Sequence, residues 1–216
     1  MKNRYGIDIW SDDNFFIEDG VVKVNYKPYP SLIKIVKDVR KQGFKGPLLL
    51  RFPHITKKQV KTLFNTFNAS IKEYDYKGKF NAVFPLKVNQ LPNFIHPLVS
   101  YGKKYNYGLE AGSKAELIIA MTYNNMGSPI TINGFKDKEM IHLCFIAKSM
   151  GHDITVIIEG LNELEMILEV LKETKMEAPN VGLRVRLHSG GSGVWAKSGG
   201  IDSKFGLTST EILEAF

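Results

Sequence analysis

The sequence has little of several features that would assign a protein to a class directly. One of its 216 residues is cysteine, Cys144, so no disulfide forms within the chain, and this scarcity is typical of a reducing compartment such as the cytoplasm. No stretch approaches the roughly 18 apolar residues of a membrane helix, and the charged start lacks the apolar run of a secretion signal. The five histidines show no metal-ligand spacing with one another or with carboxylates, so we expect no zinc site.

The overall composition is that of an ordinary globular protein. Hydrophobic residues make up 44% of the chain and charged residues 24%, which excludes a disordered tail, a collagen-like rod and a coiled coil. The formal net charge is +7, but the lysines are scattered and mostly lie opposite apolar helix stripes. We interpret the excess as solvated helix faces, with an anionic small ligand as the alternative, and we expect neither nucleic acid nor membrane among the partners.

The spacing of hydrophobic residues differs between the first part of the chain and the rest. Residues 15–24 contain two short β-prone runs around the turn pair Asp19-Gly20, which predicts a β-hairpin. After this segment, helical stripes alternate with short apolar runs, and Ser, Thr or Asn followed three positions later by Glu or Gln marks helix starts. The predicted caps are Thr56, Ser113, Asn162 and Thr208. The predicted strands are residues 48–52, 82–88, 107–111, 130–133, 154–158 and 181–187.

Alternation of strands with single amphipathic helices predicts βα units and therefore an α/β protein with a parallel sheet. Six such strands form either an open doubly wound sheet or part of a (β/α)8 barrel, which needs eight. The last helix opens at Thr208 and the chain stops within it, so we favour a truncated barrel over residues 31–216. Residues 1–30 are then expected to be an N-terminal β segment that belongs to a separate β domain.

Lys87 is the first candidate for chemistry. It lies at the carboxyl end of the predicted strand 82–88, which is the end where barrel enzymes build their sites. Its neighbours Leu86 and Val88 are apolar, so we expect partial desolvation, which favours the neutral amine that forms Schiff bases. From position alone the alternative is a surface lysine whose stem packs on apolar neighbours.

Other motifs are less informative by themselves. Residues 191–196 match a G-x-G-x-x-A dinucleotide fingerprint, but no helix opens there, so we interpret the glycine-rich stretch 188–206 as a loop over a site. Arg184 and Arg186 lie two apart in one predicted strand and share a face, and at least one is expected to pair with an anion or an oxygen-rich ligand. Cys144 lies on the apolar stripe of its helix and is expected to be a buried structural thiol.

The segment around Lys87, Phe-Pro-Leu-Lys-Val-Asn-Gln at 84–90, resembles the cofactor-lysine motif of the fold-type III pyridoxal-phosphate-dependent decarboxylases, above all that of the arginine-specific branch. Further matches follow in the same order along the chain. They are residues 5–10, the hairpin 15–24, and residues 107–117, 182–187 and 203–207. The resemblance implies a (β/α)8 barrel of the alanine-racemase-like type and reverses the interpretation of Lys87 as a plain surface residue.

Carried over residue by residue, the resemblance implies a cofactor site. Lys87 would form the Schiff base with pyridoxal 5'-phosphate, and Arg184 would reach the phenolic oxygen of the cofactor ring. Glu110 and Glu116 match acidic positions near the ring and its lysine, although Glu110 stands where ornithine decarboxylases carry aspartate. The family also implies a head-to-tail homodimer with shared active sites, and it allows Mg²⁺ as a second cofactor.

Some of the family's machinery has no counterpart in this sequence. The missing parts are the histidine stacked on the ring, the glycine-rich phosphate loop on a later strand, the glutamate on the pyridine nitrogen, and a cysteine-aspartate pair contributed across the dimer. The chain therefore resembles the N-terminal part of the enzyme, and we expect residues 1–216 alone to be inactive.

The implied activity is decarboxylation of L-arginine to agmatine and carbon dioxide, on the way to putrescine and spermidine. One alternative is a sister decarboxylase that acts on diaminopimelate, ornithine or carboxynorspermidine. The other is a protein that binds pyridoxal phosphate without catalysis.

Overall fold

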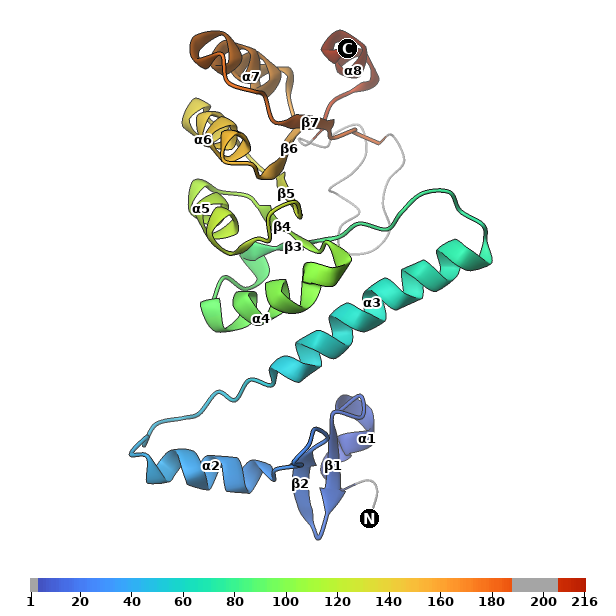
Figure 1. Ribbon diagram of the computed structural model, residues 1–216, viewed down its shortest axis with the longest axis vertical. Helices are drawn as coiled ribbons and strands as arrows, with labels where there is room; N and C mark the ends of the chain where they lie inside the picture. Colours follow the sequence, from blue (N-terminus) through green and yellow to red (C-terminus); the bar gives the residue numbers. More distant parts are fainter. Residues whose placement is uncertain (1–3, 188–205) are drawn as a thin grey trace. The chain divides into compact units, whose positions relative to one another are not determined.

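The computed structural model describes residues 4–187 and 206–216 (Figure 1). Residues 188–205 of the predicted loop 188–206 and residues 203–205 of the matching motif 203–207 lie outside these described residues. The chain forms two compact units, Met1–Gln59 and Val60–Phe216, and each is described by itself. The division at residues 30 and 31 stays a prediction. Among the described residues, no helix is both long and apolar enough to cross a membrane.

The N-terminal unit contains the hairpin that the sequence predicts. Strands β1 (Phe15–Glu18) and β2 (Val21–Val24) pair in antiparallel register, and the turn residues Asp19 and Gly20 have φ of 51° and 75°. Both positive values explain why an Asp-Gly pair stands there. The other elements of this unit are η1 (Arg4–Gly6), α1 (Ile7–Trp10) and α2 (Leu32–Lys41). The Ser31 side chain caps α2 by accepting a hydrogen bond from the Lys34 backbone N–H.

The predicted strand at residues 48–52 is wrong, because neither described sheet includes this segment. Leu48, Leu50 and Phe52 are partly buried while Leu49 is 77% exposed, which is the alternation of an extended segment covered on one side. The apolar side chains of this segment reflect its partial burial. A β-strand also needs a neighbouring strand to complete its backbone hydrogen bonds.

The next helix, α3, spans Pro53–Glu73 and thus begins three residues before the predicted cap Thr56. Proline is favoured in the first helical turn, because its fixed φ suits a helix and its missing N–H would have no partner there. This start signal outweighs the Thr56 capping pattern.

The second unit is built on a sheet of five parallel strands. They are β3 (Val83–Pro85), β4 (Gly108–Ala111), β5 (Pro129–Ile132), β6 (Asp153–Ile158) and β7 (Asn180–Leu183). Their spatial order equals their order along the chain. A doubly wound sheet would reverse its order at a switch point, so the order favours a wall of a barrel and confirms the predicted fold class.

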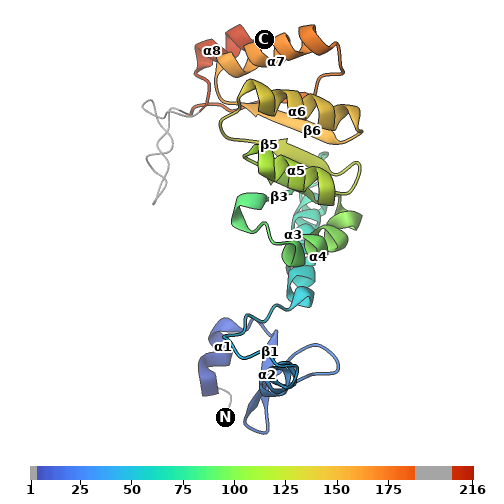
Figure 2. The same cartoon turned by 90° about the vertical axis from the view of Figure 1, so that its left-hand side faces the viewer.

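Helices α5, α6 and α7 lie side by side along one face of this sheet (Figures 1 and 2). The helical elements of the unit are η2 (Leu86–Val88), α4 (Pro92–Gly102), η3 (Lys103–Tyr105), α5 (Lys114–Tyr123), α6 (Lys138–Ser149), α7 (Leu161–Thr174) and α8 (Ser209–Ala215). Ser113 and Thr208 cap α5 and α8 as predicted. Asn162 does not cap α7: Gly160 takes the cap position, and Asn162 lies inside the helix.

The core lies between the sheet and these helices. Along β6, the side chains of Ile154, Val156 and Ile158 are buried while the alternate residues are only partly covered. The helix-facing side of the sheet is thus packed, and its other side is more open. Cys144 belongs to the packed side, and burial raises the pKa of its thiol to about 12, as suits a structural cysteine.

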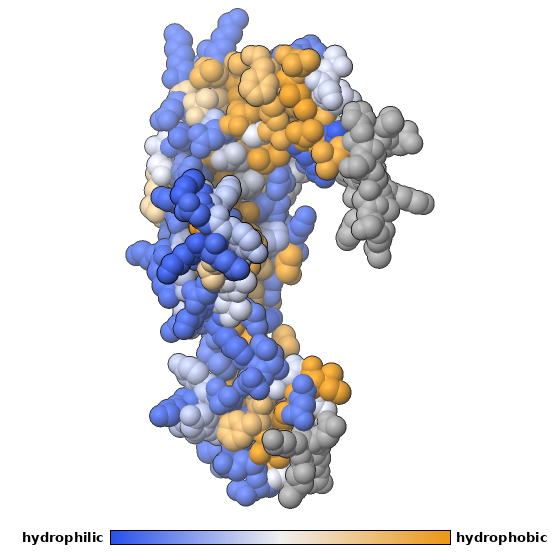
Figure 3. Space-filling model, turned by 90° about the vertical axis from the view of Figure 1, so that its right-hand side faces the viewer, coloured by the Kyte–Doolittle hydropathy of each residue, from blue (hydrophilic) through white to orange (hydrophobic). Residues whose placement is uncertain are grey.

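Strand β7 is an edge of the described sheet, with β6 as its neighbour. Hydrophobic side chains gather on the C-terminal part of this unit (Figure 3), and the exposed ones near β7 include Val181, Val185 and Leu187. The sheet is therefore least covered near β7.

Candidate functional site

The carboxyl ends of the five parallel strands meet at one edge of the sheet and surround a cavity of about 830 Å³. Barrel enzymes place their sites at this edge. Each strand contributes residues from its last positions or from the turn that follows. The lining residues are Lys87, Glu110, Gly112, Thr131, Asn133, Gly134, Ile157, Glu159, Leu183 and Arg184. Three of the four predicted site residues, Lys87, Glu110 and Arg184, are thus brought into one cavity.

Lys87 lies two residues beyond the end of β3. The strand ends at Pro85, and the chain enters the short helix η2, in which the Leu86 side chain is fully buried and anchors the turn. Lys87 and Val88 are both exposed, so the partial desolvation predicted from the apolar neighbours is wrong. Within the described part of the chain, no hydrogen bond or ion pair engages the Lys87 ammonium group. The amine is therefore open to a ligand in the cavity.

Two buried carboxylates stand on the β4 side of the site. Glu110 is the third residue of the fully buried strand β4, and its Oε1 accepts a hydrogen bond from Asn133 Nδ2 at 3.2 Å. Glu116 lies in the first turn of α5 and accepts from the Gly112 backbone N–H and from Gln90 Nε2, both at 2.7 Å. Glu116 is not among the lining residues. It ties the segment after Lys87 to the start of α5.

Arg184 occupies the position after β7, next to Glu159, which occupies the position after β6. Arg184 Nη1 donates to Glu159 Oε1 at 2.8 Å, and the Gly134 backbone N–H donates to the same oxygen at 3.3 Å. The Arg184 side chain is 42% exposed and that of Glu159 is 12% exposed, so the guanidinium faces the cavity while its partner lies deeper. A carboxylate in this place orients the arginine and offsets its charge.

Arg186 is not at the cavity. Because β7 ends at Leu183, both arginines lie beyond the strand, and the Arg186 backbone N–H donates to the Leu207 carbonyl. Hydrogen bonds from the backbone and side chain of Thr208 lower the pKa of Glu211, and the positive charge of Arg186 lowers it further. Of the two arginines predicted to share a face, Arg184 lines the cavity and Arg186 does not.

The sequence did not single out three charged residues of this region. Glu159 lies next to Arg184, and Lys136 and Glu163 form an ion pair of 3.0 Å between fully or nearly fully buried side chains. Glu159 had a signal, because it directly follows the predicted strand 154–158 and so lies at a strand's carboxyl end, as Lys87 does. Lys136 had none, since a lysine in a connecting segment is normally solvated.

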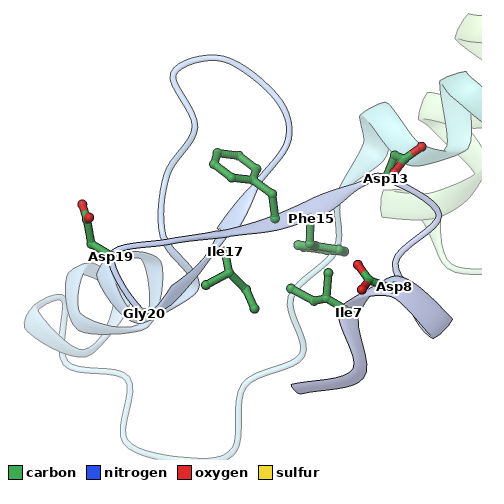
Figure 4. Close-up of a pocket in the computed structure, with 8 residues that line it drawn as sticks. Ile7, Asp8, Asp13, Phe15, Ile17, Asp19 and Gly20 are labelled. Carbon is green, nitrogen blue, oxygen red and sulfur yellow. The ribbon is translucent and has the colours of Figure 1, made fainter. Parts of the chain in front are cut away.

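A cavity of about 710 Å³ lies in the N-terminal unit (Figure 4). The side chains of Ile7, Phe15 and Ile17 turn toward one another there, whereas Asp13 and Asp19 point away at the two ends of β1. The carboxylates of Asp13 and Asp19 do not converge, and among the residues that the structure describes no amine or arginine lines the hollow. It offers no chemistry comparable to that of the strand-end cavity.

Comparison with known proteins gives concordant matches. Residues 58–216 match the family described as pyridoxal-dependent decarboxylase, pyridoxal binding domain. A biosynthetic arginine decarboxylase of Bacteroides thetaiotaomicron is 39% identical over 99% of this chain and 35% of its own length. One of Citrifermentans bemidjiense is 41% identical over 98% of this chain and 34% of its own length. The chain thus spans about a third of the length of these relatives.

Solved structures match as well. The crystal structure of the biosynthetic arginine decarboxylase from Campylobacter jejuni superposes with a TM-score of 0.88 and 58% identity, over 98% of this chain and 33% of that chain. A diaminopimelate decarboxylase from M. jannaschii superposes with a TM-score of 0.65 and 23% identity, over 94% of this chain and 43% of that chain. The latter likeness concerns the fold alone.

Proposed function

Because the chain belongs to the pyridoxal-dependent decarboxylases, of which it carries the pyridoxal-binding domain, we propose that the protein decarboxylates L-arginine to agmatine and carbon dioxide. The observation that carries the proposal is that an open amine, a buried carboxylate and a guanidinium share one strand-end cavity at Lys87, Glu110 and Arg184. The names of the relatives from Bacteroides thetaiotaomicron and Campylobacter jejuni support arginine as the substrate.

The donor set of the cavity fits pyridoxal phosphate. An open primary amine suits an aldehyde, and the Arg184 guanidinium suits a phenolic oxygen. The volume of about 830 Å³ lies within the range of roughly 300–1,000 Å³ typical of ligand pockets. When bound, this cofactor supplies an electron sink for the electron pair that remains when carbon dioxide departs.

The residues of this chain would divide the work. Lys87 Nζ would hold the aldehyde carbon, and the same amine would carry a proton at the substrate Cα. Arg184, oriented by Glu159, would fix the ring by its oxygen. Glu110 would keep a negative charge near the ring, and Glu116 would hold the Lys87 segment in place through Gln90. Their preorganised hydrogen bonds would orient the bond to be broken.

Borohydride reduction tests the cofactor part of the proposal. The tests use the full-length protein, because residues 1–216 alone are expected to be inactive, and its reduction should leave a pyridoxyl group on Lys87, detected by peptide mass spectrometry. Release of labelled carbon dioxide from L-arginine should fall by at least about a thousandfold in Lys87→Arg, because the general-acid and covalent roles are both lost. Lys172→Arg, at an exposed position of α7, is the matched control and should keep both properties. A label on another lysine would refute the assignment of Lys87.

Substrate competition tests the second part. L-arginine should be turned over with a higher kcat/KM than diaminopimelate, ornithine or carboxynorspermidine. A preference for one of these three would overturn the substrate and leave the cofactor site standing. Labelling of Lys87 without release of carbon dioxide from any substrate would instead favour a binding protein.

The resemblance also supports a cytoplasmic homodimer with shared active sites, Mg²⁺ as a second cofactor, and a place in putrescine and spermidine synthesis. Light scattering of the purified protein tests the homodimer. Activity measured after treatment with a chelator tests the requirement for Mg²⁺.

A further inference from the structure

Lys136 and Glu163 form a buried ion pair behind the strand-end cavity. Lys136 belongs to the turn between β5 and α6, and Glu163 lies in the first turn of α7. The Lys136 side chain is 0% exposed and that of Glu163 is 6% exposed, and their Nζ–Oε2 distance is 3.0 Å. Neither residue lines the cavity.

The pair is part of a closed ring of hydrogen bonds that includes a site residue. The Lys136 ammonium donates to the Gly134 carbonyl oxygen, and the Gly134 N–H donates to Glu159 Oε1 at 3.3 Å. The Glu159 N–H in turn donates to Glu163 Oε2 at 2.8 Å, which returns the ring to Lys136. Glu159 is thus fixed at two points, at its backbone by Glu163 and at its carboxylate by Gly134.

The fixed carboxylate is the one that contacts Arg184, at 2.8 Å. Taking both charges of a buried pair out of water is costly, and such a pair often adds nothing to stability compared with apolar residues of similar size. This pair also holds Glu159, which contacts Arg184. It can therefore set the geometry of the site, because the precision of a site depends on the residues that support it.

We propose that Lys136 and Glu163 are positioning residues for the cofactor site: through Gly134 and Glu159 they hold the Arg184 guanidinium at the cavity. This inference rests on the proposed function, in which Arg184 contacts the cofactor. The pair itself touches neither cofactor nor substrate.

The test removes both charges of the pair in one variant, and in a second it removes the carboxylate charge alone, which leaves the Lys136 ammonium buried without its ion-pair partner. The variants are the double replacement Lys136→Met with Glu163→Leu, and the single replacement Glu163→Gln, whose amide oxygen still accepts from the Glu159 N–H. The matched control is Lys138→Met with Glu173→Leu, which removes an exposed ion pair of 2.6 Å between α6 and α7. Each purified protein is stripped of cofactor and titrated with pyridoxal phosphate, with protein fluorescence giving Kd and thermal melting giving Tm.

The double variant should bind pyridoxal phosphate about tenfold more weakly, by analogy with the lower end of the losses that follow when hydrogen-bond partners of metal ligands are replaced. Glu163→Gln should show a smaller loss in the same direction, and the control should keep the wild-type Kd. A double-mutant cycle separates positioning from general loosening: in an Arg184→Ala background, removal of the pair should cause no further change in Kd.

A wild-type Kd in the double variant, or a loss that adds in full to that of Arg184→Ala, would overturn the inference. The proposed function fails separately, since it is refuted when the wild-type protein is not labelled on Lys87 by borohydride. Wild-type labelling with an unchanged Kd in the pair variants would overturn the positioning role alone.

Discussion

Replacing Gly108 with alanine tests the close approach of β4 and β5. A Cβ atom built at Gly108 would lie 1.9 Å from the Pro129 carbonyl oxygen and 2.8 Å from both its carbonyl carbon and its Cγ. These atoms belong to the backbone and a proline ring, so no side-chain rotation relieves the clash. The two strands must move apart, although Leu109 and Ile130 next to them pair in the sheet and are fully or almost fully buried.

Two effects of opposite sign decide the magnitude. Removing a glycine restricts the unfolded chain and stabilises the protein by about 0.4–1 kcal/mol. Overpacking of a tightly packed interior costs about 1–3 kcal/mol and occasionally more, and contact with backbone at this distance belongs at the upper end. A displaced ladder bond costs about another 1 kcal/mol. We therefore expect Gly108→Ala to lower the free energy of unfolding by about 3 kcal/mol.

Urea unfolding followed by circular dichroism measures this change, with Gly112→Ala as the matched control. A Cβ at Gly112 would meet Glu116 Oε2 at 3.6 Å and the Asn133 carbonyl oxygen at 3.7 Å, which are ordinary contacts. Here the unfolded-state effect should prevail, and the stability should stay equal or rise by up to about 1 kcal/mol. Equal unfolding midpoints for the two variants would refute the argument, because they would mean that β4 and β5 are not this close at Gly108.

Two further predictions follow. Arg184→Ala should lower kcat and cofactor affinity strongly but change stability by no more than about 1 kcal/mol, because its ion pair with Glu159 is partly exposed; an unchanged kcat with a lowered Tm would mark Arg184 as structural. Burial lowers the pKa of His152 below its ordinary value of 6.5, so the unfolded chain takes up the proton first as the pH falls. The contribution of neutral His152 to the free energy of unfolding should therefore be complete above about pH 6.5 and decline below it. Urea unfolding at several pH values should show a shallower decline of this free energy in His152→Gln than in the wild type. Equal pH dependence of the two proteins would contradict this reasoning.

Much of the second unit could be predicted because its signals are local. A cap such as Ser113 or Thr208 contacts a backbone N–H three residues away, so the pattern that announces the helix also forms the bond. The carboxyl end of a strand needs only the apolar run before it, and this was enough to place Lys87 at the edge of a sheet, whereas Glu110 was named by the family resemblance.

The missed features depend on partners far along the chain. The bond between Arg184 and Glu159 joins residues 25 positions apart, and the burial of Lys136 depends on Glu163 in the next βα unit. Lys87 shows the same limit, because its apolar neighbours along the chain did not reveal that its side chain would remain exposed at the cavity. The segment 48–52 has the composition of a strand, but composition supplies no neighbouring strand to pair with.

Because the strands of the sheet are ordered as they are along the chain, the sheet can form strand by strand during synthesis. Each strand pairs with the next one along the chain, as in Val83 with Gly108, Ile130 with Ile154, and Val156 with Val181. Such short separations keep the loop-closure cost low, so a chain made at about 5–20 residues per second can dock each unit on its predecessor as it emerges. Among the described groups of the cavity, the Arg184 guanidinium then arrives last, onto a Glu159 that Gly134 and Glu163 already hold.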